Sequence, residues 1–164
     1  MSDAETIDEF WAAARHQLRL NPLPGYFGTF SSESLAPPAW AFGATPDVAD
    51  SLLALVLAGT KTATAGALWD YEAAGERLPE AGDLSIVLDG DGHPRALIKA
   101  TAVEVTPFDE VDEEHAWLEG EGDRSLATWR ADHERFFTEY AEHDRGFDPR
   151  MPVVLERFDL VYPV

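Results

Sequence analysis

Two β-rich runs, residues 84–88 and 96–105, are joined through Asp89-Gly90-Asp91-Gly92, and this joint constrains the fold more than any other feature of the chain. Asp and Gly adopt positive φ angles at little cost, so such a sequence is a strong signal for a tight reversal between paired strands. We therefore predict an antiparallel hairpin here. Residues 39–42 are expected to form a short aromatic strand, and residues 153–162 a last strand.

Apolar residues recur at helical spacing in several other segments. Residues 7–18 carry an apolar stripe with acids near the start, an order that suits the helix dipole. A second helix is expected to begin at Thr45, a candidate N-cap, and to end before Gly59, which can adopt the left-handed C-cap conformation. We also expect a short acidic helix at residues 109–118 and a longer helix at residues 126–140.

The order of these elements indicates the fold class. Strands separated by irregular lengths, with few alternations of helix and strand, favour a mostly antiparallel sheet or small barrel over a doubly wound parallel sheet. Helices would then pack on its outside. Because the chain has 164 residues and no linker long enough to separate two domains, one compact α+β unit is expected.

Acidic residues dominate the composition: 31 Asp and Glu face 12 Lys and Arg, giving a formal net charge of -19. Neutralising phosphates needs Lys and Arg, so this charge argues against a general nucleic-acid coat. RNA binding would need a local basic patch, and screening over about 8 Å at physiological salt would let such a patch act. The available donors are Arg15, Arg19, Arg77, Arg124 and Arg130.

The sequence excludes several other classes of function. Without cysteine it has no disulfide, no thiolate metal ligand and no Cys nucleophile. It contains no P-loop, dinucleotide fingerprint, G-x-S-x-G elbow or H-E-x-x-H motif, and its histidines form no i, i+4 pair, so we expect neither metal nor cofactor. An acidic N-terminus and a short apolar run at residues 52–58 predict neither a secretory signal nor a membrane span, which favours a cytoplasmic protein.

Residues 59–64, Gly-Thr-Lys-Thr-Ala-Thr, are the best candidates for chemistry. One of the two lysines, Lys61, lies there beside three hydroxyls, directly after a helix-ending Gly. On a regular strand Lys61 and Thr64 face opposite sides, so they can meet only if this segment is a turn or an irregular strand entry. From spacing alone, a solvated Lys on a Thr-rich strand edge is the more common outcome.

Glu104 lies in the run of residues 100–105, whose alternation leaves open which face is inward. It is either on the polar face of a half-exposed sheet, the more common case, or a buried acid held for a partner such as Lys61. Aromatic side chains near the candidate segment in sequence could stack on a base, although core packing is their usual role. They are Trp40, Phe42, Trp69 and Tyr71.

Several blocks of the chain together resemble the ASCH domain, a relative of the PUA-like β-barrels. Residues 59–64 are similar to the family's G-x-K-x-x-T signature. The other blocks that carry the likeness are residues 68–72, 78–83, 103–108, 119–126 and 151–158, together with Trp129, Arg130 and His133.

The resemblance implies a PUA-like, small and mostly antiparallel β-barrel, with helices packed outside and a cleft beside the Lys-containing turn. It assigns residues 39–164 to the ASCH domain and residues 1–38 to an N-terminal helix and loop packed on that domain. Members of the family are linked to RNA binding, to single-strand ribonuclease activity and to amide hydrolysis of N4-acetylcytidine. The Lys, Thr and Glu of the amidohydrolase site match Lys61, Thr64 and Glu104.

These three residue types form a chemically sensible set. A buried, neutral Lys61 would take the hydroxyl proton of Thr64, the oxygen would attack the acyl carbonyl, and Glu104 would pass a proton to the leaving amine. We therefore expect hydrolysis of an N4-acylated cytidine. The alternatives are binding or cleavage of single-stranded RNA in the same cleft, and a non-catalytic regulator that binds a nucleotide or RNA. The residues expected to contact the ligand are Trp40, Phe42, Thr62, Trp69, Tyr71 and Arg130.

Overall fold

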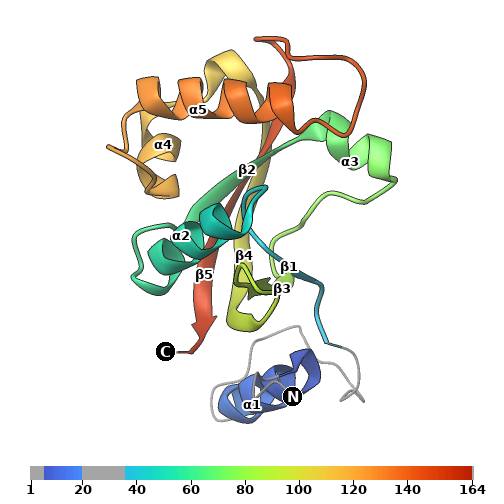
Figure 1. Ribbon diagram of the computed structural model, residues 1–164, viewed down its shortest axis with the longest axis vertical. Coiled ribbons are helices and arrows are strands. Elements are labelled where there is room, and N and C mark those ends of the chain that lie inside the picture. Colours follow the sequence, from blue (N-terminus) through green and yellow to red (C-terminus); the bar gives the residue numbers. More distant parts are fainter. Residues whose placement is uncertain (1–5, 20–35, 164) are drawn as a thin grey trace.

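The computed structural model describes residues 6–19 and 36–163, and Figure 1 shows how their helices and strands are arranged. In chain order the elements are α1 (Ile7–Arg19), β1 (Ala39–Trp40), α2 (Pro46–Leu57), β2 (Ala63–Ala67), α3 (Leu68–Ala74), β3 (Leu84–Leu88), β4 (Pro94–Pro107), the 3-10 turn η1 (Phe108–Glu110), α4 (Glu113–Glu119), α5 (Leu126–Glu139) and β5 (Pro152–Tyr162).

The strands form one sheet in the order β1-β3-β4-β5-β2. Every neighbouring pair is antiparallel except β1 and β3, which run parallel. The expected α+β class is therefore confirmed, whereas the expected closed barrel is wrong. Within the described residues β1 has only two residues and pairs with β3, while β2 pairs with β5, so the two edge strands do not meet to close the sheet.

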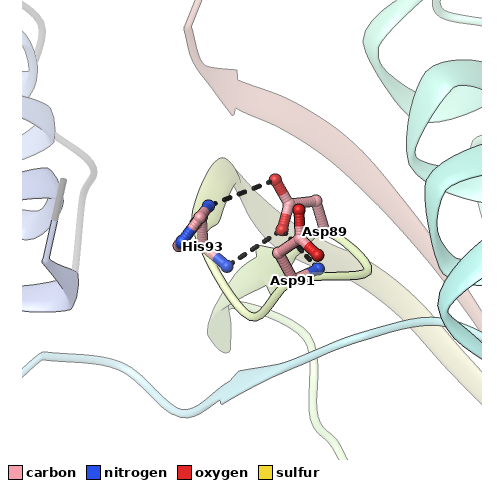
Figure 2. Close-up of side chains that lie close together, drawn as sticks. All are labelled: Asp89, Asp91 and His93. Atoms are coloured by element: carbon pink, nitrogen blue, oxygen red, sulfur yellow. Dashed lines mark hydrogen bonds and ion pairs between the residues drawn. The ribbon is translucent and has the colours of Figure 1, made fainter. Parts of the chain in front are cut away.

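The hairpin predicted from the Asp-Gly joint is present as β3 and β4. Gly92 has a φ of +84°, and Oδ1 of Asp89 accepts hydrogen bonds from the backbone N–H groups of Asp91 (2.9 Å) and His93 (3.0 Å) (Figure 2). Local side-chain capping of this kind stabilises a turn at one position in the chain. The pairing of β3 with β4, two consecutive strands, follows directly from this turn.

Capping side chains set where four helices begin. At the start of α1, Oγ1 of Thr6 accepts a hydrogen bond from the backbone N–H of Glu9 at 3.1 Å. Thr45 accepts a hydrogen bond from the third residue after it at the start of α2, and Asp112 and Ser125 do the same for α4 and α5. Because Asp112 is the cap, α4 begins later than the sequence pattern indicates. Helix α3 was not predicted: no side-chain hydrogen bond caps its start, and it ends at Gly75 with a φ of +69°.

Alternate side chains of the sheet pack under different helices. On β4, Leu97 packs with Phe10 and Trp11 of α1, whereas the next residue, Ile98, packs with Leu53 of α2. Helices α4 and α5 pack on the sheet through a separate apolar cluster, which includes Ala116, Trp129 and Phe137. Figure 1 shows these two helices at the opposite end of the molecule from α1. The loop that follows α1 lies outside the described residues. No helix in the described part of the chain is long and apolar enough to cross a membrane.

Candidate active site

The candidate site begins at the turn between α2 and β2. Gly59 has a φ of +81°, as expected for a residue that ends a helix and reverses the chain. The N–H groups of Thr60 and Lys61 both donate to the carbonyl oxygen of Leu55, at 2.9 and 3.1 Å. The turn is thereby fixed to the last part of α2, and the regular strand starts only at Ala63.

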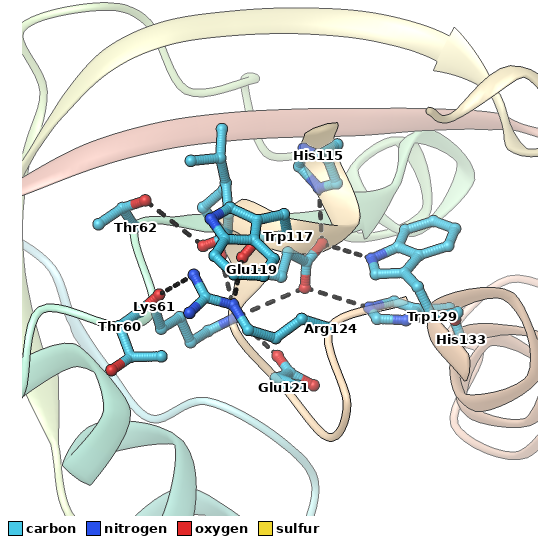
Figure 3. Close-up of polar contacts among 12 residues, drawn as sticks. Thr60, Lys61, Thr62, His115, Trp117, Glu119, Glu121, Arg124, Trp129 and His133 are labelled. Carbon is cyan, nitrogen blue, oxygen red and sulfur yellow. Dashed lines mark hydrogen bonds and ion pairs between the residues drawn. The ribbon is translucent and has the colours of Figure 1, made fainter. Parts of the chain in front are cut away.

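Lys61 is 1% exposed, and its ammonium is surrounded by acceptors. Its Nζ donates to the carbonyl oxygen of Ala63 at 2.9 Å. It also donates to Oε2 of Glu121 (2.7 Å) and to Oε1 of Glu119 (3.4 Å) (Figure 3). The ring centroid of Phe42 lies 5.2 Å from the same atom. These contacts match the donors of a charged lysine, so the geometry favours the ammonium over the neutral base expected from the sequence.

Glu119, the last residue of α4, is also 1% exposed. Its Oε2 accepts from Nε1 of Trp129 (2.8 Å) and lies 2.6 Å from Nε2 of His115, while Oε1 lies 3.4 Å from Nε2 of His133. Burial acts to raise the pKa of Glu119, but the charges of His133 and Lys61 and the hydrogen bond to His115 hold it well below its usual range. The site therefore contains an ionised, buried carboxylate.

The contact with Glu119 also shifts the pKa of His133. Burial of the His133 ring acts to lower its pKa, but the charge and hydrogen bond of Glu119 outweigh burial, and the pKa is raised. The ring also stacks on Trp129, with centroids 4.1 Å apart. His133 and Lys61 thus flank one buried carboxylate, and the contact with Glu119 favours the protonated form of the His133 ring.

A glycine allows α4 to end against the turn. Gly120 has a φ of +72°, and a Cβ at this position would lie 2.5 Å from the carbonyl oxygen of Thr60. Next to this contact, the N–H of Thr62 donates to the carbonyl oxygen of Leu118 at 2.8 Å. The close approach of the two backbones brings the acids of the α4 end to the buried lysine.

Sequence reasoning missed Glu119 as a member of the site. Its contact with Lys61 joins residues 58 positions apart, so no spacing rule within one element reveals it. The local signal that could have drawn attention to it is the i, i+4 relation of His115 and Glu119, which places both on one face of α4.

Thr64 and Glu104 lie on opposite faces of the sheet. Thr64 pairs across β2 and β5 with Glu156, whereas Glu104 pairs across β4 and β5 with the preceding residue, Leu155. Because successive residues of a strand point to opposite faces, the two side chains diverge. Glu104 is exposed, accepts a hydrogen bond from Oγ1 of Thr106 (3.0 Å) and lines a pocket of about 100 Å³. Lys61 pairs with Glu119 and Glu121, so the expected pairing of Glu104 with the lysine is not formed.

Some of the residues expected to contact a ligand lie at the Lys61 network. Phe42 is buried beside the ammonium, and Trp40 packs edge to face on Phe42 with ring centroids 4.8 Å apart. Oγ1 of Thr62 donates to a backbone carbonyl of α4 at 3.4 Å. Phe42 and Trp40 thus belong to the apolar cluster under α2, whereas Thr62 contacts the end of α4.

The other expected ligand contacts lie elsewhere. Trp69 packs edge to face with His143, with centroids 5.2 Å apart. Nη2 of Arg130 donates to two backbone carbonyls of the segment after β4, each at 3.1 Å, and so holds α5 in place. Tyr71 packs over Gly66, because a Cβ added there would lie 3.3 Å from Cε2 of the ring. Of these, Tyr71 shares a face of the sheet with Thr64.

The arginines considered for a basic patch do not gather at one place in the described part of the chain. Arg124 lies nearest the site: its guanidinium is 3.6 Å from the ring centroid of the exposed Trp117, and its Nη2 is 3.4 Å from the carbonyl oxygen of Thr60. The side chain of Arg19 is outside the described residues. The others lie on α1 (Arg15), before β3 (Arg77) and on α5 (Arg130).

A group of potential metal ligands lies in the hairpin turn. Asp89, Asp91 and His93 offer ligand atoms within 4.8 Å of one another. Burial acts to raise the pKa of Asp89, but the backbone hydrogen bonds from His93 and Asp91 outweigh it and lower the pKa. The Asp89 carboxylate is thus engaged in capping the hairpin.

The comparisons with known proteins agree with this architecture. The sequence model of the ASCH domain matches residues 38–162. An ASCH domain structure from Lactobacillus crispatus JV V101 is 29% identical, with a TM-score of 0.78 over 99% of both chains. Protein EF3133 from Enterococcus faecalis V583 is 33% identical, with a TM-score of 0.75 over 93% of this chain and 90% of that one. The hypothetical protein PH0355, at 19% identity and a TM-score of 0.50, shares the fold. A search of curated proteins gave no significant match.

Proposed function

Because the chain belongs to the ASCH domain family, we propose that it is an amidohydrolase that removes the acyl group of an N4-acylated cytidine, with Thr64 and Lys61 at its centre. The observation that carries this proposal is the buried ammonium of Lys61, held between Glu119 and Glu121. Groups with strongly perturbed pKa values cluster at functional sites, and the pKa of Glu119, the partner of Lys61, is held well below its usual range. The strongly acidic surface is compatible with a neutral nucleoside as substrate.

The proposed roles follow from the contacts of each side chain. The Lys61 ammonium binds the carbonyl oxygen of Ala63, one residue before Thr64, so its positive charge lies beside the backbone of the nucleophile. A fixed cation there stabilises the oxyanion that forms when the Thr64 oxygen attacks the acyl carbonyl. Glu119, and not Glu104, is the acid that pairs with Lys61 and holds its side chain in position.

The test is a chromatographic assay of cytidine release from N4-acetylcytidine. Wild type is expected to release cytidine, and Lys61→Ala and Thr64→Ala to lose roughly 100-fold or more of this rate. Exposed Glu134→Gln on α5 is the matched control for an altered charge. Turnover that persists in Lys61→Ala would refute the mechanism, and no release by wild type would refute the substrate class.

One observation favours the alternative of single-stranded RNA as ligand. Trp117 is 55% exposed and carries the Arg124 guanidinium on its ring, close to the Lys61 turn. Aromatic and guanidinium planes stack on unpaired bases. A binding titration with single-stranded RNA at two salt concentrations tests this function. The absence of binding at low salt would refute RNA binding.

A further inference from the structure

Glu156 occupies a position beside the proposed nucleophile. It lies on β5, between β2 and β4, and pairs with Thr64 on one side and Val103 on the other. Directly paired side chains point to the same face, with Cβ atoms about 5 Å apart. Tyr71 covers this face over Gly66, two residues beyond Thr64 on β2.

The Glu156 side chain is largely buried, and its carboxylate has no protein partner among the described residues. Its side chain is 9% exposed, yet no side chain or backbone group in the described part of the chain forms a hydrogen bond or ion pair with it. Buried acids are normally satisfied, as Glu119 is by Lys61, Trp129 and two histidines. A largely buried acid without an ion-pair or hydrogen-bond partner costs stability, and acids with shifted pKa values cluster at functional sites.

The charged groups that act on Glu156 and on the neighbouring Tyr71 are acidic. Asp83, before β3, is engaged by Nη1 of Arg77 at 3.0 Å, and Tyr71 and Glu76 lie in and after α3. Burial first, and then the charge of Asp83, raises the pKa of Glu156 to about 7. Burial, Glu156 and Glu76 raise the pKa of Tyr71 to about 12, so the phenol stays neutral while the carboxyl exchanges its proton near neutral pH.

We propose that Glu156 is the general base that takes the hydroxyl proton of Thr64, an assignment that rests on the proposed acyl transfer to this threonine. A base other than Lys61 is needed for this step. The Lys61 ammonium donates its protons to Ala63, Glu119 and Glu121, and it has no lone pair to accept another proton. Glu156 then performs the proton transfer, and Lys61 supplies the charge.

The proposed reaction has two steps, acylation of Thr64 and hydrolysis of the resulting ester. As Glu156 accepts the hydroxyl proton, the Thr64 oxygen forms a bond to the acyl carbon and the carbonyl electron pair moves to its oxygen. When that pair returns, the C–N bond breaks, and the protonated Glu156 gives its proton to the departing amine. Water then attacks the acyl ester in the same way: its proton passes through Glu156 to the Thr64 oxygen, and the carboxylic acid leaves.

A test that does not depend on the nucleoside uses p-nitrophenyl acetate as acyl donor. The full-length protein is mixed with the ester across pH 5 to about 9, nitrophenolate release is followed, and peptide mass mapping locates the acetyl group. We expect wild type to be acetylated at Thr64, with a rate that rises through a pH of about 7. Glu156→Gln should be slower by roughly 100-fold or more and lose this pH dependence, and Glu156→Asp should recover part of both.

Asp159→Asn, an exposed acid on the same strand, is the matched control and should behave as wild type. Equal rates in wild type and Glu156→Gln, or acetylation of wild type at sites other than Thr64, would overturn the assignment. Acetylation at Thr64 that depends on Glu156, without cytidine release from N4-acetylcytidine, would support the general base and refute only the proposed substrate.

Discussion

Nζ of Lys61 lies 3.4 Å from Oε1 of Glu119, and both side chains are 1% exposed. Two charges at this depth are stable only when each is fully partnered, because water no longer solvates them. The pair joins the turn after α2 to the end of α4, so it combines a structural role with the proposed catalytic one.

Removal of one member of this pair should strongly destabilise the protein. Lys61→Met leaves Glu119 with only histidines and Trp129 as partners, and we expect a loss of about 3 kcal/mol in the free energy of unfolding. In Lys61→Met/Glu119→Gln the loss should be smaller than the sum of the single losses by about 1–3 kcal/mol. Urea unfolding of the four proteins measures this coupling, and strictly additive losses would show that the two residues do not interact.

The contact between α4 and the turn should depend on Gly120. Gly120→Ala adds a Cβ 2.5 Å from the carbonyl oxygen of Thr60 and strains a φ of +72°, so we expect a loss of roughly 3 kcal/mol. Gly75→Ala is the matched control: its φ is +69°, but a Cβ there meets nothing within 4 Å, and strain alone should cost about 1 kcal/mol. Equal losses in the two variants, measured by urea unfolding, would argue against a tight α4 contact.

Glu156 should make stability depend on pH in a defined direction. Its pKa rises from 4.5 to about 7 on folding, so the folded state favours the neutral acid. Below pH 4.5 the carboxyl is neutral in the folded and the unfolded state, so it does not change the free energy of unfolding. As the pH rises through 7, the carboxyl ionises in the folded state, which must then bury a charge, and the protein is destabilised. Relative to Glu156→Gln, wild type should therefore lose roughly 2–3 kcal/mol between these limits. A difference in unfolding free energy that stays constant from pH 4 to about 8 would contradict the burial of this acid.

The two candidate acids can be separated by activity. Glu119→Gln should reduce cytidine release roughly 100-fold or more, because the neutral amide no longer holds the Lys61 ammonium. Glu104→Gln should remain within about twofold of wild type, since Glu104 is exposed on the opposite face of the sheet from Thr64. The steady-state rates of both variants decide between the assignment from the sequence and the assignment from the structure.

Features with a local physical cause could be predicted from the sequence. The Asp-Gly hairpin, the Thr45 cap and the Gly59 reversal each depend on a few adjacent residues, and all are present. The segment around Lys61 was identified for the same reason, since a lysine directly follows a helix-ending glycine.

Features that depend on strand order or on distant contacts could not be predicted. The alternation of residues 100–105 leaves the face of Glu104 open, and only its pairing with Leu155 settles it. The roles of Glu119 and Glu156 depend on which elements pack together, as does the open sheet, whose edge strands β1 and β2 never meet in the described part of the chain.

The most direct test of the central claim is the rate of cytidine release from N4-acetylcytidine by wild type, Lys61→Ala and Thr64→Ala under identical conditions. The account predicts release by wild type and a loss of roughly 100-fold or more in each variant, with unfolding curves showing that the variants are folded. Release that is unchanged in either folded variant, or no release by wild type, would contradict it.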